Sequence, residues 1–109
     1  MTSMREPTFL ILTALAVRAL HGYAVIREVE RLSDGRVVIP AGTLYAALDR
    51  LTGEGLVEPE RSEVVEGRHR RYYRLTDGGA AALAADADRQ RRNAAAAAKR
   101  LRLRAAGPR

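Results

Sequence analysis

Residues 42–76 read GTLYAALDRLTGEGLVEPERSEVVEGRHRRYYRLT, and this stretch decides the fold of the chain. Its first part, residues 42–53, carries four apolar residues on one face of a helical wheel: Leu44, Ala47, Leu48 and Leu51. That spacing predicts a helix with one buried face and an opposite face that is free.

The second part of the stretch predicts a β-hairpin. Two β-rich segments, residues 56–65 and 68–75, flank the turn residues Glu66 and Gly67. Pro59 then belongs on an edge strand or at a bulge, because it has no N–H to donate to a ladder. Strand alternation divides the second segment into a face with His69, Arg71, Tyr73 and Leu75 and a face with Arg68, Arg70, Tyr72 and Arg74.

Two more helices are predicted before this stretch. Pro7 is a good first-turn residue, and residues 9–17 after it are apolar nearly all the way round, which favours a helix buried on most sides. Residues 23–32 have apolar positions at helical spacing, and residues 33–35 end that helix. The β-branched run 37–39 indicates a short strand or an extended connection.

A fourth helix is predicted from Thr76, a plausible N-cap, through an Ala- and Arg-rich sequence to Gly107. Three helices followed by a hairpin is the winged helix-turn-helix plan, a mainly α (α+β) fold. We therefore expect a winged-helix domain over residues 1–76 and a C-terminal helix with a frayed end over 77–109.

Composition excludes several classes of protein. The 109 residues include no Cys and two His, so disulfides, Cys nucleophiles and an intrachain metal site are not expected. The sequence has no nucleophile–base constellation and no Gly-rich phosphate loop, so we expect neither an enzyme nor a cofactor. It has no signal-peptide pattern and no apolar run of about 20 residues, which predicts a soluble, cytoplasmic protein without a membrane partner.

The net charge of +6 is unevenly distributed. Residues 1–60 hold six Arg and eight acids, net −2; residues 61–74 hold five Arg and two Glu, net +3. Residues 75–85 add one Asp, so the first 85 residues are neutral overall, and residues 86–109 carry the whole excess. A polyanionic partner, nucleic acid first, is favoured by the arrangement of these charges and less by their sum.

Several stretches together resemble the PadR-like transcriptional regulators of bacteria. They are His21-Gly22-Tyr23, Gly42-Thr43-Leu44-Tyr45-Ala46-Ala47-Leu48, Arg50-Leu51, Gly55-Leu56-Val57, Gly67 through Thr76, and Gly79 with Leu83. The resemblance covers residues 9 to about 83. It implies a cytoplasmic, nucleoid-associated homodimer that binds a palindromic operator in double-stranded DNA, most often as a repressor.

The resemblance also implies roles for particular elements. The third helix would enter the major groove, the hairpin wing would contact backbone or minor groove, and the C-terminal helix would dimerise. A small aromatic effector bound near the dimer interface is a further implied partner, although the chain has no Trp and no aromatic residue after Tyr73.

The candidate DNA-binding residues lie on the third helix and on the wing. They are Gly42, Thr43, Tyr45, Ala46, Arg50, Arg68, His69, Arg70 and Arg71. Hydroxyl and guanidinium groups can hold phosphates or base edges, and small residues let the backbone come close. The alternatives are a turn role for Gly42, an N-cap role for Thr43, packing of Tyr45 on the core, partial neutralisation of Arg50 by Asp49 or Glu54, and a solvated hairpin tip. His21 is interpreted as structural.

The candidate dimerisation residues lie on the first and fourth helices. They are Phe9, Leu12, Leu83, Ala87, Gln90, Ala94, Ala97 and Leu101, of which the last six follow a heptad-like seam. A mostly solvated basic helix is the alternative, because a seam of small residues buries little area.

Two other functions stay open at this stage. The neutral first 85 residues also suit a winged-helix protein-interaction module without specific DNA binding. Residues 86–109 also suit a helix associated with RNA or a membrane surface, although they lack the bulky apolar face that interfacial insertion requires.

Overall fold

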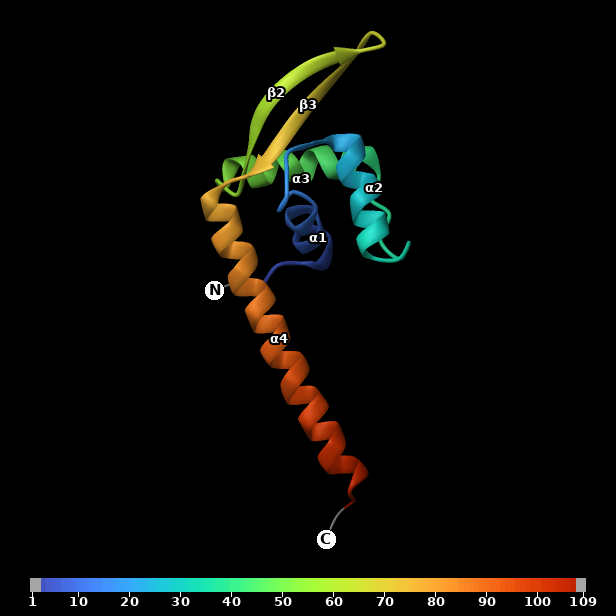
Figure 1. The fold of residues 1–109 in the computed structure, drawn as a ribbon, viewed down its shortest axis with the longest axis vertical. Coiled ribbons are helices and arrows are strands. Elements are labelled where there is room, and N and C mark those ends of the chain that lie inside the picture. The colour runs from blue at the N-terminus through green and yellow to red at the C-terminus, as the bar shows by residue number, and fades with distance from the viewer. Residues whose placement is uncertain (1–2, 108–109) are drawn as a thin grey trace.

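The computed structural model describes residues 3–107 as three helices, a small sheet and one long helix that extends away from the body (Figure 1). The elements are α1 (Glu6–Ala14), β1 (Leu20–His21), α2 (Gly22–Leu32), α3 (Ala41–Gly53), β2 (Val57–Val65), β3 (Arg68–Leu75) and α4 (Asp77–Ala105). Apart from β1, this is the expected α+β order. The molecule is elongated, with a longest dimension of 69 Å against 27 and 21 Å for the other two.

The core lies among α1, α2 and α3 and is closed by the base of the hairpin. It consists of Ile11, Leu12, Ala14, Leu15, Val25, Val29, Ile39, Leu44, Leu48, Leu51, Val57 and Tyr73. The three leucines of α3 are fully buried, which confirms the face predicted from their spacing.

Helix α1 is shorter than predicted. It ends at Ala14, and Val17, expected inside a helix buried on most sides, is 86% exposed. Leu15 stays in the core because the chain turns there. After this turn the chain continues into β1, which pairs with β3. The helix therefore ends before the apolar segment 9–17 is complete.

The hairpin carries a third strand that was not predicted from the sequence. The sheet order is β1-β3-β2, with Leu20 opposite Tyr73 and His21 opposite Tyr72. The ladder between β2 and β3 is irregular between Pro59 and Ser62, which confirms the edge or bulge position of the proline. Val37–Ile39 forms the extended connection, not a strand.

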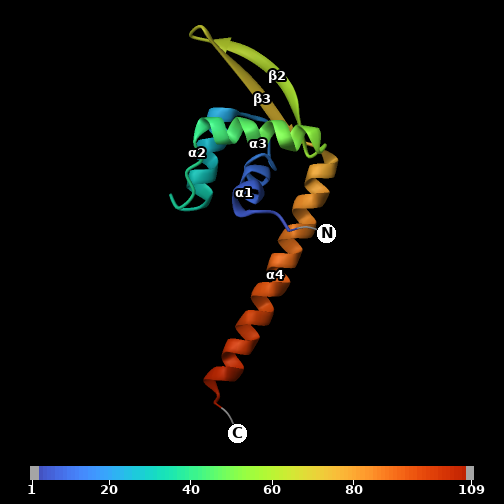
Figure 2. The same ribbon diagram turned by 180° about the vertical axis from the view of Figure 1, so that it is seen from behind.

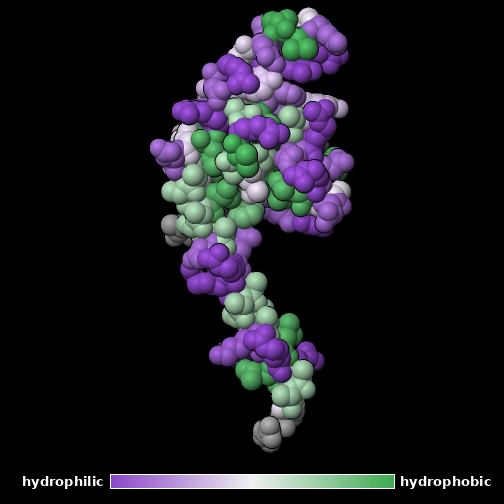
Figure 3. Space-filling model, viewed as in Figure 1, coloured by the Kyte–Doolittle hydropathy of each residue, from purple (hydrophilic) through white to green (hydrophobic). Residues whose placement is uncertain are grey.

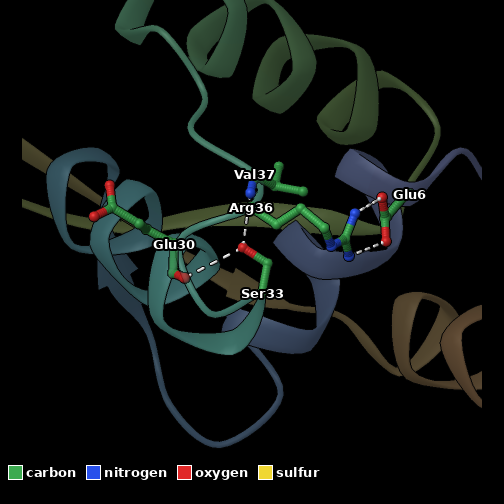
Figure 4. A network of polar contacts seen from close by, with 5 residues as sticks. All are labelled: Glu6, Glu30, Ser33, Arg36 and Val37. Carbon is green, nitrogen blue, oxygen red and sulfur yellow. Dashed lines mark hydrogen bonds and ion pairs between the residues drawn. The ribbon is translucent and has the colours of Figure 1, made fainter.

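Polar contacts fix this connection between α2 and α3 (Figure 4). The Ser33 hydroxyl donates to the Glu30 carbonyl at 3.2 Å and accepts from the Val37 N–H at 2.9 Å. The Arg36 guanidinium makes a two-pronged contact with the Glu6 carboxylate at 2.8 and 2.5 Å. The connection is thereby tied to the start of α1.

Helix α4 begins as predicted, with the Thr76 hydroxyl accepting from the Gly79 N–H at 2.9 Å. Its first turns pack on the body, and Asp86 is buried there, accepting from Gln90, Arg89 and the Met4 N–H. The Gln90 hydrogen bond first, and then those of Arg89 and Met4, hold the pKa of Asp86 below its ordinary value. From residue 90 to residue 106 every side chain is exposed. This part of α4 projects beyond the rest of the molecule (Figure 2).

Candidate nucleic-acid interface

Helix α3 presents one open face below the hairpin (Figure 2). All five of its candidate DNA-binding residues are exposed: Gly42, Thr43, Tyr45, Ala46 and Arg50. Pro40, not Thr43, is the N-cap residue, and no hydrogen bond described within residues 3–107 uses the Thr43 hydroxyl. Thr43 therefore has a free hydroxyl on the open face, and its alternative role as a cap is wrong.

Tyr45 is held in place by a glycine of α2. A Cβ atom on Gly22 would lie 2.5 Å from the Tyr45 hydroxyl oxygen, so the ring rests against the Gly22 backbone. The residue is 45% exposed, so Tyr45 is not a buried core residue. Gly22 of the His-Gly-Tyr motif is thus the partner of Tyr45, a contact between two motifs that sequence spacing alone does not reveal.

The wing presents its cations on both faces. The tight turn uses positive φ angles at Glu66 (52°) and Gly67 (78°), and the four candidate residues that follow are exposed. Lower on the hairpin, Arg61 lies 4.0 Å over the Tyr72 ring and Arg74 pairs with Glu58. Within residues 3–107, no ion pair is found for the remaining wing arginines, which are Arg68, Arg70 and Arg71.

Two surface hollows are lined by residues of both the wing and α3. One of about 370 Å³ is lined by Tyr45, Asp49, Ser62, His69, Arg71 and Tyr73. The other, of about 340 Å³, is lined by His21, Tyr23, Tyr45, Arg68, His69 and Arg70. Tyr45 and His69 border both hollows, so the open face of α3 and the wing cations form one continuous surface. Hydrophilic residues dominate the hairpin in Figure 3.

Arg50 is separate from this cluster. Its guanidinium donates to the Thr8 hydroxyl at 3.0 Å and to the Glu54 carboxylate at 3.4 Å, on the side of α3 that faces α1. It borders a different hollow, of about 610 Å³, with Thr8 and Glu54. In this arrangement Arg50 is partly neutralised and turned away from the wing.

His21 has the structural role predicted for it. Its Nδ1 atom accepts from the Ala24 N–H at 3.2 Å, which caps α2, and its ring meets the Tyr72 ring edge-on at 5.3 Å between centroids. Burial lowers the pKa of His21, and the nearby charges of Arg70 and Arg27 lower it further, against an opposing effect of Glu63. The folded chain therefore favours the neutral imidazole, whose Nδ1 is free to accept.

This pKa shift predicts a loss of stability in mild acid. The stability that neutral His21 contributes is fully present above about pH 6.5 and is lost as the pH falls through the lowered folded pKa. Urea unfolding at about pH 7.5 and about pH 5 measures it, with His21→Asn as the matched variant, since Asn caps helices without titrating. We expect a larger drop in the wild type; equal drops would contradict the assignment.

The candidate dimerisation residues are divided between the body and the projecting part of α4. Leu12 has 0% exposure within one chain, so its assignment to a dimer interface is wrong: it is a core residue with no surface left for a second subunit. Phe9, Leu83 and Ala87 are partly buried against their own body, and Gln90 donates to Asp86 at 2.9 Å. Ala94, Ala97 and Leu101 are exposed.

Residues 3–107 contain no group of three or more His, Cys, Asp or Glu side chains placed to hold a metal ion. Over the same residues, no helix combines the length and the apolar character needed to cross a membrane.

Comparison with known proteins gives concordant matches. Residues 11–85 match the profile of the transcriptional regulator PadR-like family. Transcriptional regulator Rv3488 of Mycobacterium tuberculosis is 45% identical over 76 residues, which cover 70% of this chain and 67% of that protein.

Solved structures agree in fold. A PadR family transcription regulator from Clostridium difficile has a TM-score of 0.74 at 22% identity, covering 89% of this chain and 99% of that one. Bacillus subtilis PadR, crystallised in complex with operator DNA, has a TM-score of 0.63 at 25% identity, covering 72% of this chain and 46% of that one.

Proposed function

We propose that this chain, which belongs to the PadR-like family of transcriptional regulators, binds a palindromic operator as a homodimer and acts as a repressor. Family membership makes it a transcriptional regulator and not an enzyme. The observation that carries the finer proposal is the continuous surface formed by the open face of α3 and the wing, bordered by Tyr45 and His69.

Helix α3 is the element that enters the major groove. Its open face carries the exposed Thr43 hydroxyl, the half-exposed Tyr45 ring and the small residues Gly42 and Ala46, so the helix axis can approach the base edges. The solved complex of Bacillus subtilis PadR, which is similar in fold, with operator DNA supports DNA binding by this chain.

The wing supplies the phosphate contacts. Arg68, Arg70 and Arg71 are exposed and have no ion-pair partner within residues 3–107, so their charges are available to phosphates or to a narrow minor groove. Arg50 would join them only after giving up its contacts with Glu54 and Thr8.

The homodimer is supported by the projecting half of α4. A free-standing helical segment gains little stability without tertiary packing, and a second copy would cover Ala94, Ala97 and Leu101, of which Leu101 is 62% exposed. Phe9 and Ala87, both partly buried, can complete such an interface. An aromatic effector would find no aromatic side chain on α4, so it would have to bind beside other elements.

Footprinting on the DNA that flanks the chain's own gene tests the proposal. We expect a protected palindrome whose half-sites lie about one helical turn apart, or a multiple of it, because a two-fold dimer presents two α3 helices. No protection of any flanking fragment, together with co-purification of a protein partner, would favour the protein-interaction module instead.

A further inference from the structure

Asp49 is an acidic residue in the middle of the open face of α3. It lies on the side of the helix opposite the buried Leu44, Leu48 and Leu51, and it is exposed. It borders the hollow that His69 and Arg71 also line, yet no ion pair or hydrogen bond of its carboxylate is found within residues 3–107. Asp49 therefore lies on the face that DNA would approach if α3 enters the major groove.

A carboxylate in this place is unfavourable against DNA unless it finds a donor. Phosphates repel it, and the acceptor atoms of guanine and thymine offer it nothing in the major groove. Cytosine presents an exocyclic amine there with no neighbouring acceptor, whereas adenine places the N7 acceptor beside its amine. The base edge that suits a lone carboxylate is therefore that of cytosine.

The surroundings of Asp49 suit the short reach of its side chain. Gly42, Ala46 and Gly53 lie on the same open face and add nothing beyond a Cβ atom. A Cβ on Gly42 or Gly53 would meet no atom of the described chain within 4 Å, so packing inside the chain does not require these glycines. Their small size lets the helix come close enough to the groove floor for an Asp to reach a base.

We propose that Asp49 is a specificity-determining residue that accepts a hydrogen bond from the exocyclic amine of a cytosine in each operator half-site. This rests on the proposed function, since it needs α3 in the major groove. The neighbouring Arg50 donates hydrogen bonds to Thr8 and Glu54. Asp49 is therefore the charged side chain in the centre of the open face of α3.

The test is selection of binding sites from a randomised duplex pool by the full-length protein. Wild type, Asp49→Ala, Asp49→Asn and Glu30→Ala are compared, the last removing the same charge from an exposed position of α2. We expect the wild type and Glu30→Ala to fix one cytosine per half-site, with about 5- to 150-fold discrimination against other bases there. Asp49→Ala should lose that preference alone.

Asp49→Asn gives an outcome that misfolding cannot imitate. Its amide both donates and accepts, so the preference should move from cytosine to adenine. If the wild type and Asp49→Ala enrich the same motif, the inference on Asp49 is overturned while the proposed function stands. The same conclusion follows if Asp49→Ala only binds all sequences more tightly, to the same extent as Glu30→Ala, because loss of the negative charge would then explain the effect. If the wild type enriches no motif, the proposed function itself fails.

Discussion

Replacing Arg68, Arg70 and Arg71 together by Gln is expected to weaken DNA binding by about 10³-fold or more at about 0.1 M salt. If each protomer neutralises about five phosphates, the wild-type slope of log K against log salt is near −9. The triple variant removes about six contacts per dimer, so its slope should fall to roughly −4. Equilibrium titration of the footprinted duplex over a salt series measures both quantities.

A second triple variant separates the arrangement of charge from its amount. Arg100, Arg102 and Arg104 lie near the far end of α4, and replacing them by Gln removes the same three charges per chain. Because these residues lie at the end of the long axis opposite the wing (Figure 1), the slope should stay near −9. An equal fall of slope in the two triple variants would place DNA on the tail and overturn the wing assignment.

Local patterns were sufficient wherever neighbouring residues decide the structure. The leucine spacing of α3 sets its buried face, and the Thr76 hydroxyl caps α4 through an N–H three residues away. The positive φ angles of Glu66 and Gly67 close the hairpin at the turn that the sequence predicted. Each of these features depends on residues a few positions apart, which is what periodicity and turn chemistry report.

Features set by distant residues could not be predicted in this way. The strand β1 exists because Leu20 lies opposite Tyr73, and no periodicity joins positions so far apart. Leu12 was predicted as a dimerisation residue on an apolar helix, but it is fully buried in the core of its own chain. Arg50 lies on the exposed side of α3, and only the structure shows that Thr8 holds it.

In the candidate nucleic-acid interface, too, some features follow from local sequence patterns and others only from tertiary packing. The exposed face of α3 followed from helical spacing, but the wing is exposed on both faces near its tip, which strand alternation does not predict. That Tyr45 rests on Gly22, and that His69 and Asp49 border one hollow, follows from the packing of α2, α3 and the hairpin against each other. Helical spacing places Asp49 on the outer side of α3, but the role proposed for it depends on the absence of a partner for its carboxylate among the described residues.

Gly79→Ala is expected to destabilise the chain by about 2 kcal/mol or more. A Cβ there would lie 2.0 Å from the Leu56 carbonyl oxygen and 2.7 Å from Leu75 Cδ1. The carbonyl cannot move freely, because it accepts from the Thr76 N–H at 3.1 Å. The start of α4 would have to shift, which outweighs the roughly 1 kcal/mol that Ala gains over Gly in a helix.

The neighbouring glycine supplies the matched control. A Cβ on Gly78 would lie 3.4 Å from the Gly55 carbonyl oxygen, an ordinary contact, and the position is exposed. Gly78→Ala should therefore stabilise the chain by up to about 1 kcal/mol through helix propensity. Thermal unfolding at one fixed protein concentration measures the pair, with a midpoint roughly 8 °C or more lower for Gly79→Ala and a few degrees higher for Gly78→Ala. Changes of the same sign in both variants would mean that propensity, and not the approach of α4 to Leu56, governs this helix start.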